Sequence, residues 1–164
     1  MILILISYEH DLVVARASIL LLNGPNLDML GIREPAIYGT ITLKALEEMC
    51  IERAVQLGLT IECYQSNHEA LLIESLHKAR KSHDGIIINA GALSHTSIAL
   101  LDALLITELP IIEVHLSNLF KRESFRHHSY ISSVAVGLIC GFGSQSYQLA
   151  LDAMAVILKQ KSTG

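Results

Sequence analysis

Short aliphatic runs alternate along the chain with longer stretches in which apolar residues recur every three or four positions. Two runs, at residues 19–22 and 134–140, are continuously apolar, and two more, at residues 85–89 and 111–115, are mostly aliphatic, as strands buried on both faces are. A fifth segment, residues 60–64, alternates apolar and polar positions and also predicts a strand. The stretches with helical spacing predict helices over about residues 42–57, 66–81, 97–107 and 145–159.

Individual residues indicate where these elements begin and end. Gly58 follows the first helical stretch, where a left-handed residue commonly ends a helix. Ser66 and Glu69 have the spacing of a capping box, which predicts that the second helix opens at Ser66. The segment 141–143 (Gly-Phe-Gly) predicts a tight turn from the last strand into the last helix.

We interpret the order of elements as β-α-β-α-β-α-β-α-β. Continuous aliphatic strands that alternate with helices indicate a parallel sheet covered on both faces. The expected fold is an α/β, flavodoxin-like, doubly wound five-stranded sheet in a single domain over residues 19–164. Residues 1–18 precede the first core strand, and we expect them to form an amino-terminal arm, either disordered or an added segment.

Composition narrows the classes of protein that the chain could belong to. Of 164 residues 51% are hydrophobic and 17% charged, and the net charge of -4 argues against a nucleic-acid binder, which normally has a basic excess. No run of 18 or more uncharged apolar residues exists, so no membrane span is expected. The three cysteines form no C-x-x-C pair, which favours reduced thiols in a cytoplasmic protein.

Polar clusters follow three of the predicted strands directly. They are residues 23–26 (Asn-Gly-Pro-Asn) with the loop onward to residue 38, residues 89–95 and residues 113–118. Ligands of open α/β sheets bind beyond the carboxyl ends of the strands. We therefore expect the three clusters to meet at one edge of the sheet and form a site.

The third cluster gives the most specific indication of a chemical role. Glu113, His115 and Ser117 occupy alternate positions, so extended backbone would direct them to one face. A carboxylate beside an imidazole fixes its tautomer and favours the imidazolium, which a proton donor requires. A solvated histidine at a strand end and a metal site that adds His95 are the alternatives.

The loop after the first strand contains an arginine and a tyrosine. A free phenol ionises near pH 10, and a nearby cation lowers that value by about 1–3 units. Arg33 could therefore stabilise Tyr38 as a phenolate base, with Arg122 or Arg126 as a second cation. Alternatively, Tyr38 packs its ring at the entry to the next helix.

Five strings of the sequence together resemble those of the type II 3-dehydroquinate dehydratases. They are LLLNGPNLDMLGIREPAIYG, QSNHE, IIINAGALSHTSIALLDAL, PIIEVHLSN and KRESFRHHSYIS, and they occur in the order and spacing of that family. The resemblance covers residues 19 to about 158, nearly the whole chain.

The resemblance implies an anti elimination that converts 3-dehydroquinate to 3-dehydroshikimate through an enolate, in the shikimate or quinate pathway. It implies Tyr38 as the base that removes the proton α to the ketone, with Arg33 as the cation that stabilises the transition state. His115 would protonate the departing hydroxyl, oriented by Glu113, and Asn26 would stabilise the enolate oxygen through a water.

The resemblance also implies how the substrate is held. Contacts are expected from Asn89, His95, Leu116, Ser117 and Arg126, the amides of Leu116 and Ser117 being the contacting groups. Asp102 would reach the site of a neighbouring subunit in a homododecamer built from four trimers. No metal and no cofactor are implied. The alternatives are a non-catalytic flavodoxin-like module that binds a small ligand, and a hydrolase in which Ser117 is the nucleophile.

Overall fold

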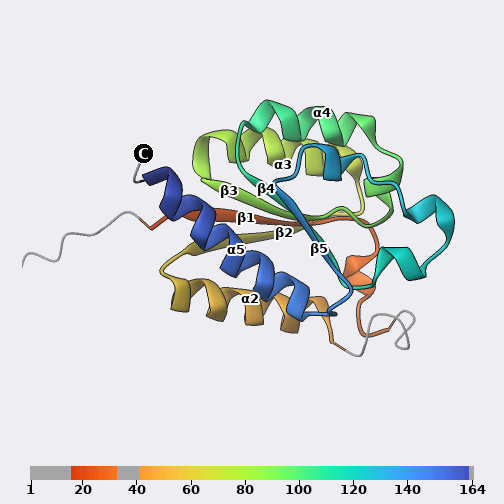
Figure 1. Cartoon of the computed structure of the whole chain (residues 1–164), viewed down its shortest axis with the longest axis horizontal. Helices are drawn as coiled ribbons and strands as arrows, with labels where there is room; N and C mark the ends of the chain where they lie inside the picture. Colours follow the sequence, from red (N-terminus) through yellow and green to blue (C-terminus); the bar gives the residue numbers. More distant parts are fainter. Residues whose placement is uncertain (1–15, 33–40, 163–164) are drawn as a thin grey trace, which may run out of the picture.

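The computed structural model describes residues 16–32 and 41–162, and within them five parallel strands form one sheet (Figure 1). The strand order is β2-β1-β3-β4-β5. The strands are β1 (Ser18–Asn23), β2 (Thr60–Gln65), β3 (Gly85–Asn89), β4 (Ile111–His115) and β5 (Gly137–Cys140). The doubly wound, flavodoxin-like fold predicted from the sequence is confirmed.

Two pairs of helices cover the two faces of the sheet (Figure 1). Helices α2 (Leu43–Leu57) and α5 (Gln145–Ser162) lie against one face, and α3 (Glu69–Ser82) and α4 (Ile98–Thr107) against the other. Side chains of a strand alternate between the faces, so Ile19 and Leu21 of β1 pack with α2 and α5, whereas Leu20 and Leu22 pack with α3 and α4. The continuous aliphatic runs are therefore explained by two separate cores.

Two of the helices begin at residues whose side chains satisfy free backbone N–H groups. Thr42 accepts from the Ala45 amide at 3.2 Å, and Ser97 accepts from the Leu100 amide at 2.8 Å. Helix α2 ends at Gly58, whose φ of 73° is the left-handed conformation expected from the sequence.

Two of the predicted boundaries are wrong. The predicted capping box does not form, because α3 begins at Glu69 with His68 as its N-cap, and Ser66 accepts from the His68 amide instead. Strand β5 begins at Gly137 rather than at residue 134, because the amides of Val134 and Ala135 donate to the Ile131 carbonyl and complete a 3-10 turn. Pairing with β4 can start only after that turn.

The predicted alternation of strands and helices is wrong at its end. No α-helix joins β4 to β5; residues 116–136 contain the short 3-10 turns η3, η4 and η5 (Leu119–Lys121, Ser124–Arg126 and Ile131–Ser133). Ile131 is buried in the core between the sheet and helices α3 and α4, so this connection crosses on that face. Helix α5 follows β5 and fills the opposite face beside α2.

Most of the predicted amino-terminal arm lies outside the described residues, and its boundary stays a prediction. Ser18 is already the first residue of β1. In the described part of the chain, no helix is both long and apolar enough to cross a membrane.

Candidate active site

The carboxyl ends of β1, β3 and β4 border a pocket of about 120 Å³. Its position is the edge at which the sequence predicts three polar clusters to meet, and residues of all three line it. The lining residues are Pro25, Asn26, Leu27, Met29, Leu30, Asn89, Gly91, Ala92, His95, His115, Leu116, Ser117, Leu119, Arg122 and Arg126.

Two glycines allow the loops after β1 and β3 to approach closely. A Cβ on Gly24 would lie 2.5 Å from the Ala90 carbonyl oxygen, a distance so short that any side chain at this position would clash. Gly91 has a φ of 57°, and its Cβ would meet the Pro25 carbonyl oxygen at 3.0 Å. The close contact between these loops brings Asn26 and Asn89 to the same pocket.

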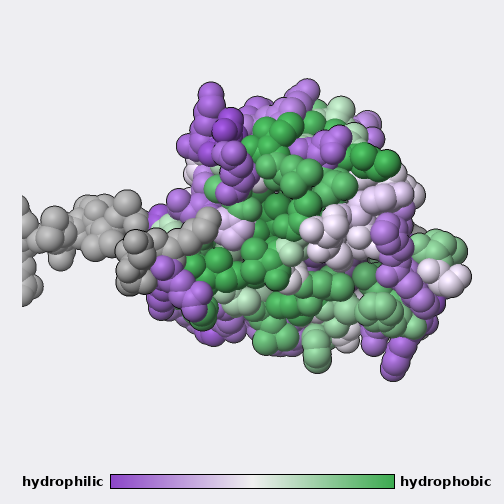
Figure 2. Space-filling model, turned by 45° about the horizontal axis from the view of Figure 1, so that its top comes forward, coloured by the Kyte–Doolittle hydropathy of each residue, from purple (hydrophilic) through white to green (hydrophobic). Residues whose placement is uncertain are grey.

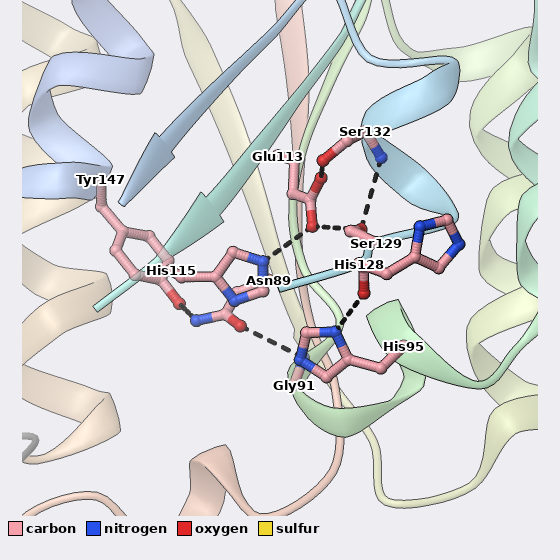
Figure 3. Close-up of polar contacts among 9 residues, drawn as sticks. All are labelled: Asn89, Gly91, His95, Glu113, His115, His128, Ser129, Ser132 and Tyr147. Carbon is pink, nitrogen blue, oxygen red and sulfur yellow. Dashed lines mark hydrogen bonds and ion pairs between the residues drawn. The ribbon is translucent and has the colours of Figure 1, made fainter. Parts of the chain in front are cut away.

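Glu113 and His115 form a buried hydrogen-bonded pair at the end of β4 (Figure 3). His115 Nε2 lies 2.7 Å from Glu113 Oε1, and the two residues are 5% and 0% exposed. Because an ionised carboxylate only accepts, Nε2 carries the hydrogen of this bond. His115 Nδ1 is then the ring nitrogen left for a ligand in the pocket that His115 lines.

Two serines from the β4–β5 connection also bind the Glu113 carboxylate. Ser129 Oγ donates to Oε1 at 2.7 Å, and Ser132 Oγ donates to Oε2. Burial by itself would raise the pKa of Glu113, but the hydrogen bonds from His115, Ser132 and Ser129 outweigh it and hold the pKa below its usual value. Glu113 is therefore a buried negative charge at neutral pH, and it can stabilise a positive charge on His115.

His95 lies beside this pair and is kept neutral. Its ring stacks on His115 with centroids 6.3 Å apart, and its Nδ1 lies 2.7 Å from the His128 carbonyl oxygen, to which it donates (Figure 3). Burial lowers the pKa of His95, although the bond to His128 opposes this. The Nε2 of a neutral imidazole whose hydrogen is on Nδ1 is an acceptor, suited to a ligand hydroxyl.

The cationic part of the pocket comes from Arg126, with Arg122 as a second lining residue. Arg126 Nε donates to Glu123 at 2.9 Å, and its guanidinium carbon lies 5.1 Å from the centre of the Phe125 ring. A guanidinium has five N–H donors, so an arginine bound through Nε can still receive a carboxylate.

Three predicted site residues are not placed at the pocket by the structure. Arg33 and Tyr38 lie outside the described residues. Asp102 lies on the exposed side of α4, away from the pocket lining, where Ile98, Leu105 and Ile106 are all more than half exposed. Figure 2 turns this side of the molecule toward the viewer and shows apolar residues gathered on it.

The alternative chemistries of this edge find little support in the described part of the chain. No hydrogen bond joins Ser117 to His115 in this part of the chain, so the structure does not pair a serine nucleophile with that imidazole. No group of three His, Cys, Asp or Glu side chains there could hold a metal ion. Cys50 and Cys63 are free thiols, and burial raises the pKa of each to about 12, so they are protonated and unreactive at neutral pH.

The sequence predicted no role for four residues that organise the site: Ser129, Ser132, Asn23 and Tyr147. The serines bind Glu113, and the Tyr147 hydroxyl bridges the side chains of Asn23 and Asn89. One signal was present in the sequence, because Asn23 directly follows the predicted buried strand 19–22 and Asn89 ends the predicted strand 85–89. Such residues need partners, since an unpaired buried amide is costly.

Comparison with known proteins agrees with this geometry. A family model described as dehydroquinase class II matches residues 17–155. A 3-dehydroquinate dehydratase from Ruegeria pomeroyi is 55% identical over 141 residues, which are 86% of this chain and 95% of that protein. One from Dinoroseobacter shibae is 57% identical over 136 residues, 83% of this chain and 91% of that protein.

A solved structure shows the same fold at lower identity. The crystal structure of type II dehydroquinase from Propionibacterium acnes has a TM-score of 0.83 and 44% sequence identity, and the match covers 87% of this chain and 99% of that chain. On the family model, these relatives and the shared fold, the chain belongs to the class II dehydroquinase family.

Proposed function

We propose that the chain is a lyase that dehydrates 3-dehydroquinate to 3-dehydroshikimate in the shikimate pathway. The relatives described above are 3-dehydroquinate dehydratases. The observation that carries the proposal is the buried Glu113–His115 pair at the wall of the pocket. An imidazole in contact with a buried carboxylate can carry a second proton, and it can give that proton to a hydroxyl that leaves as water.

In the proposed reaction, the Tyr38 phenolate removes the proton from the carbon α to the ketone, and the electrons of that C–H bond form an enolate. The enolate then collapses to a carbon–carbon double bond as the β carbon–oxygen bond breaks. His115 gives the proton on Nδ1 to the departing oxygen, which leaves as water, while Glu113 stabilises the imidazolium. The step consumes no oxidant or reductant, and no metal or cofactor is required.

The roles of Tyr38 and Arg33 rest on the resemblance of the sequence around them. Met29 and Leu30 line the pocket, and Arg33 follows Leu30 by three positions in the sequence. A cation beside the phenol would keep it ionised, as a base near neutral pH must be. Asn26, at the pocket edge, would stabilise the enolate oxygen through a water.

The remaining pocket residues suit a polyhydroxylated carboxylate. Arg126 would bind the carboxylate, Asn89 and neutral His95 would bind hydroxyls, and the amides of Leu116 and Ser117 would donate to the bound anion. Such a ligand needs many directed polar partners rather than a large apolar cavity.

The proposed activity has a direct optical test. The product is a conjugated enone and the substrate is not, so ultraviolet absorbance should rise when the protein is added to 3-dehydroquinate. The same ligand should be titrated against the protein by calorimetry. Binding of 3-dehydroquinate without any rise in absorbance would indicate a non-catalytic binding module and contradict the proposal.

We also propose that the enzyme works in the cytoplasm as a homododecamer of four trimers, each site being completed by Asp102 of a neighbouring subunit. The exposed apolar side chains of α4 around Asp102 support a subunit interface there, since such patches are usually covered. Free cysteines in the described residues fit a reducing compartment.

Mixing two inactive variants tests the shared site. Asp102→Ala retains Tyr38, and Tyr38→Phe retains Asp102, so co-refolding should create some sites that contain both residues. Provided that Asp102→Ala alone is strongly impaired, the mixture should be more active than either variant. Mixed oligomers, confirmed by native mass spectrometry, without a gain in activity would show that Asp102 does not act across an interface.

A further inference from the structure

A directed chain of hydrogen bonds runs from the pocket into the core beneath it. The Gly91 amide donates to Asn89 Oδ1 at 3.2 Å, and Asn89 Nδ2 donates to the Tyr147 hydroxyl at 2.8 Å (Figure 3). The Tyr147 hydroxyl donates to Asn23 Oδ1 at 2.9 Å, and Asn23 Nδ2 donates to Glu47 Oε1 at 3.4 Å. Asn89 is the member of this chain that lines the pocket.

The fold brings these side chains together from four separate elements. Asn23 and Asn89 are register partners at the carboxyl ends of β1 and β3. Tyr147 lies in the first turn of α5, and Glu47 lies on α2. Asn23 and Tyr147 have no exposed surface and Asn89 has 3%, so each polar group depends on these bonds.

The two ends of the chain fix its direction. A backbone amide can only donate, so the atom of Asn89 that faces Gly91 must be the oxygen. At the other end the Glu47 carboxylate accepts, so Asn23 presents its nitrogen to Glu47 and its oxygen to Tyr147. The single hydroxyl hydrogen of Tyr147 goes to Asn23, and its oxygen is left to accept from Asn89.

A rotated Asn89 amide would break this pattern. Its nitrogen would face the Gly91 amide, donor against donor, and its oxygen would compete with Asn23 for the one hydrogen of Tyr147. The orientation observed leaves the second hydrogen of Asn89 Nδ2 for a ligand.

Tyr147 is suited to this place because it does not ionise. Complete burial raises the pKa of its phenol far above the ordinary value, and the hydrogen bond from Asn89 offsets this only in part. The hydroxyl therefore keeps its hydrogen throughout the working pH range and serves as a fixed link rather than as a base.

We propose that Tyr147 and Asn23 are positioning residues that hold the amide of Asn89 in the orientation that binds substrate, so that they control KM rather than kcat. The inference rests on the proposed function, in which Asn89 contacts a substrate hydroxyl. Neither residue touches the substrate or takes part in proton transfer.

Tyr147→Phe removes the central hydroxyl and keeps the buried ring. We expect KM for 3-dehydroquinate to rise about tenfold, the effect of losing one oriented hydrogen bond, with kcat within about threefold of the wild type. Tyr64→Phe is the matched control, because Tyr64 is a half-buried tyrosine of β2 outside the pocket lining. Its KM should equal that of the wild type.

A double-mutant cycle separates positioning from a general loss of packing. If Tyr147 acts through Asn89, adding Tyr147→Phe to Asn89→Ala should raise KM no further, whereas independent effects would multiply. Should Tyr147→Phe fail to fold, Asn23→Ala removes the next link of the chain. Asn23→Ala should raise KM when Asn89 is intact, but it should raise KM no further when it is combined with Asn89→Ala.

The results of these experiments distinguish a failure of the positioning role from a failure of the proposed activity. A wild-type protein that does not raise absorbance would overturn both. An active wild type with an unchanged KM in Tyr147→Phe, or a rise in KM that persists in Asn89→Ala, would overturn only the positioning role.

Discussion

Replacing Glu113 by glutamine removes one buried negative charge and keeps the size of the side chain. Glu113 accepts from His115 at 2.7 Å, from Ser129 at 2.7 Å and from Ser132. A glutamine oxygen can still accept from His115, and a serine hydroxyl can turn to accept from the new NH2 group. The hydrogen bonds can therefore be rebuilt, and the quantity that is lost is the charge.

The structure sets the size of the expected effect. A positive charge on His115 would be in hydrogen-bond contact with a carboxylate that has no exposed surface. An opposite charge at such a distance stabilises the charged form of a group by about 1.4–4 kcal/mol in proteins. If His115 must be an imidazolium to protonate the leaving hydroxyl, kcat of Glu113→Gln should fall by about 10- to 1,000-fold.

The assay should separate the two chemical steps. Absorbance reports overall turnover, whereas exchange of the substrate's acidic hydrogen for deuterium reports removal of the proton alone. Glu113→Gln should slow turnover more than exchange, because the charge acts on the acid and not on the base. Circular dichroism should confirm that the variant is folded.

Glu62→Gln is the matched control, since it also removes the charge of a glutamate on a parallel strand that contacts a histidine, here His83 at the end of α3. Glu62 lies 3.4 Å from His83, its side chain is 65% exposed, and it is not part of the pocket lining. Its kcat should stay at the wild-type value. A folded Glu113→Gln protein with kcat within threefold of the wild type would refute the assignment of His115 as a charge-stabilised acid.

Three further predictions concern the base, metals and acid stability. Tyr38→Phe should abolish turnover while calorimetry still detects ligand binding, and activity within tenfold of the wild type would show that another group is the base. EDTA should leave turnover unchanged, and inhibition that added metal reverses would contradict the metal-free mechanism. Because the folded-state pKa of Glu113 is depressed from about 4.5, its stabilisation is complete above that pH and is lost as pH falls toward the folded value. Denaturant unfolding between about pH 5 and pH 3 should therefore show a shallower loss of stability in Glu113→Gln than in the wild type, and equal slopes would contradict the depressed pKa.

The hydrophobic pattern predicted most of the fold because parallel strands buried on both faces appear in the sequence as short, mostly aliphatic runs. The errors fall where short-range polar contacts compete with that pattern. Ser66 has the spacing of a helix cap, yet its hydroxyl accepts from the His68 amide two residues on, and the helix begins later. Val134 begins an apolar run, yet its amide completes a 3-10 turn.

The pair of Glu113 and His115 could be predicted because residues two apart on a strand point to one face. Its supporting contacts could not. Ser129 and Ser132 lie 16 and 19 positions from Glu113, and Tyr147 lies 124 positions from Asn23. Such contacts depend on how a connection folds back over the sheet, which periodicity does not encode.

The connection between β4 and β5 explains why the alternation of strands and helices fails where it does. Parallel strands are usually joined through a helix, and a connection longer than about 12–15 residues without one is usually functional. Residues 116–136 form this connection, and they supply Arg126 to the pocket, the His128 carbonyl to His95, and Ser129 and Ser132 to Glu113. A regular helix uses its internal carbonyls for its own hydrogen bonds, whereas the His128 carbonyl of this segment accepts from His95. The hydroxyls that this segment folds back over the sheet are therefore, with His115, what allows Glu113 to remain charged at the end of a buried strand.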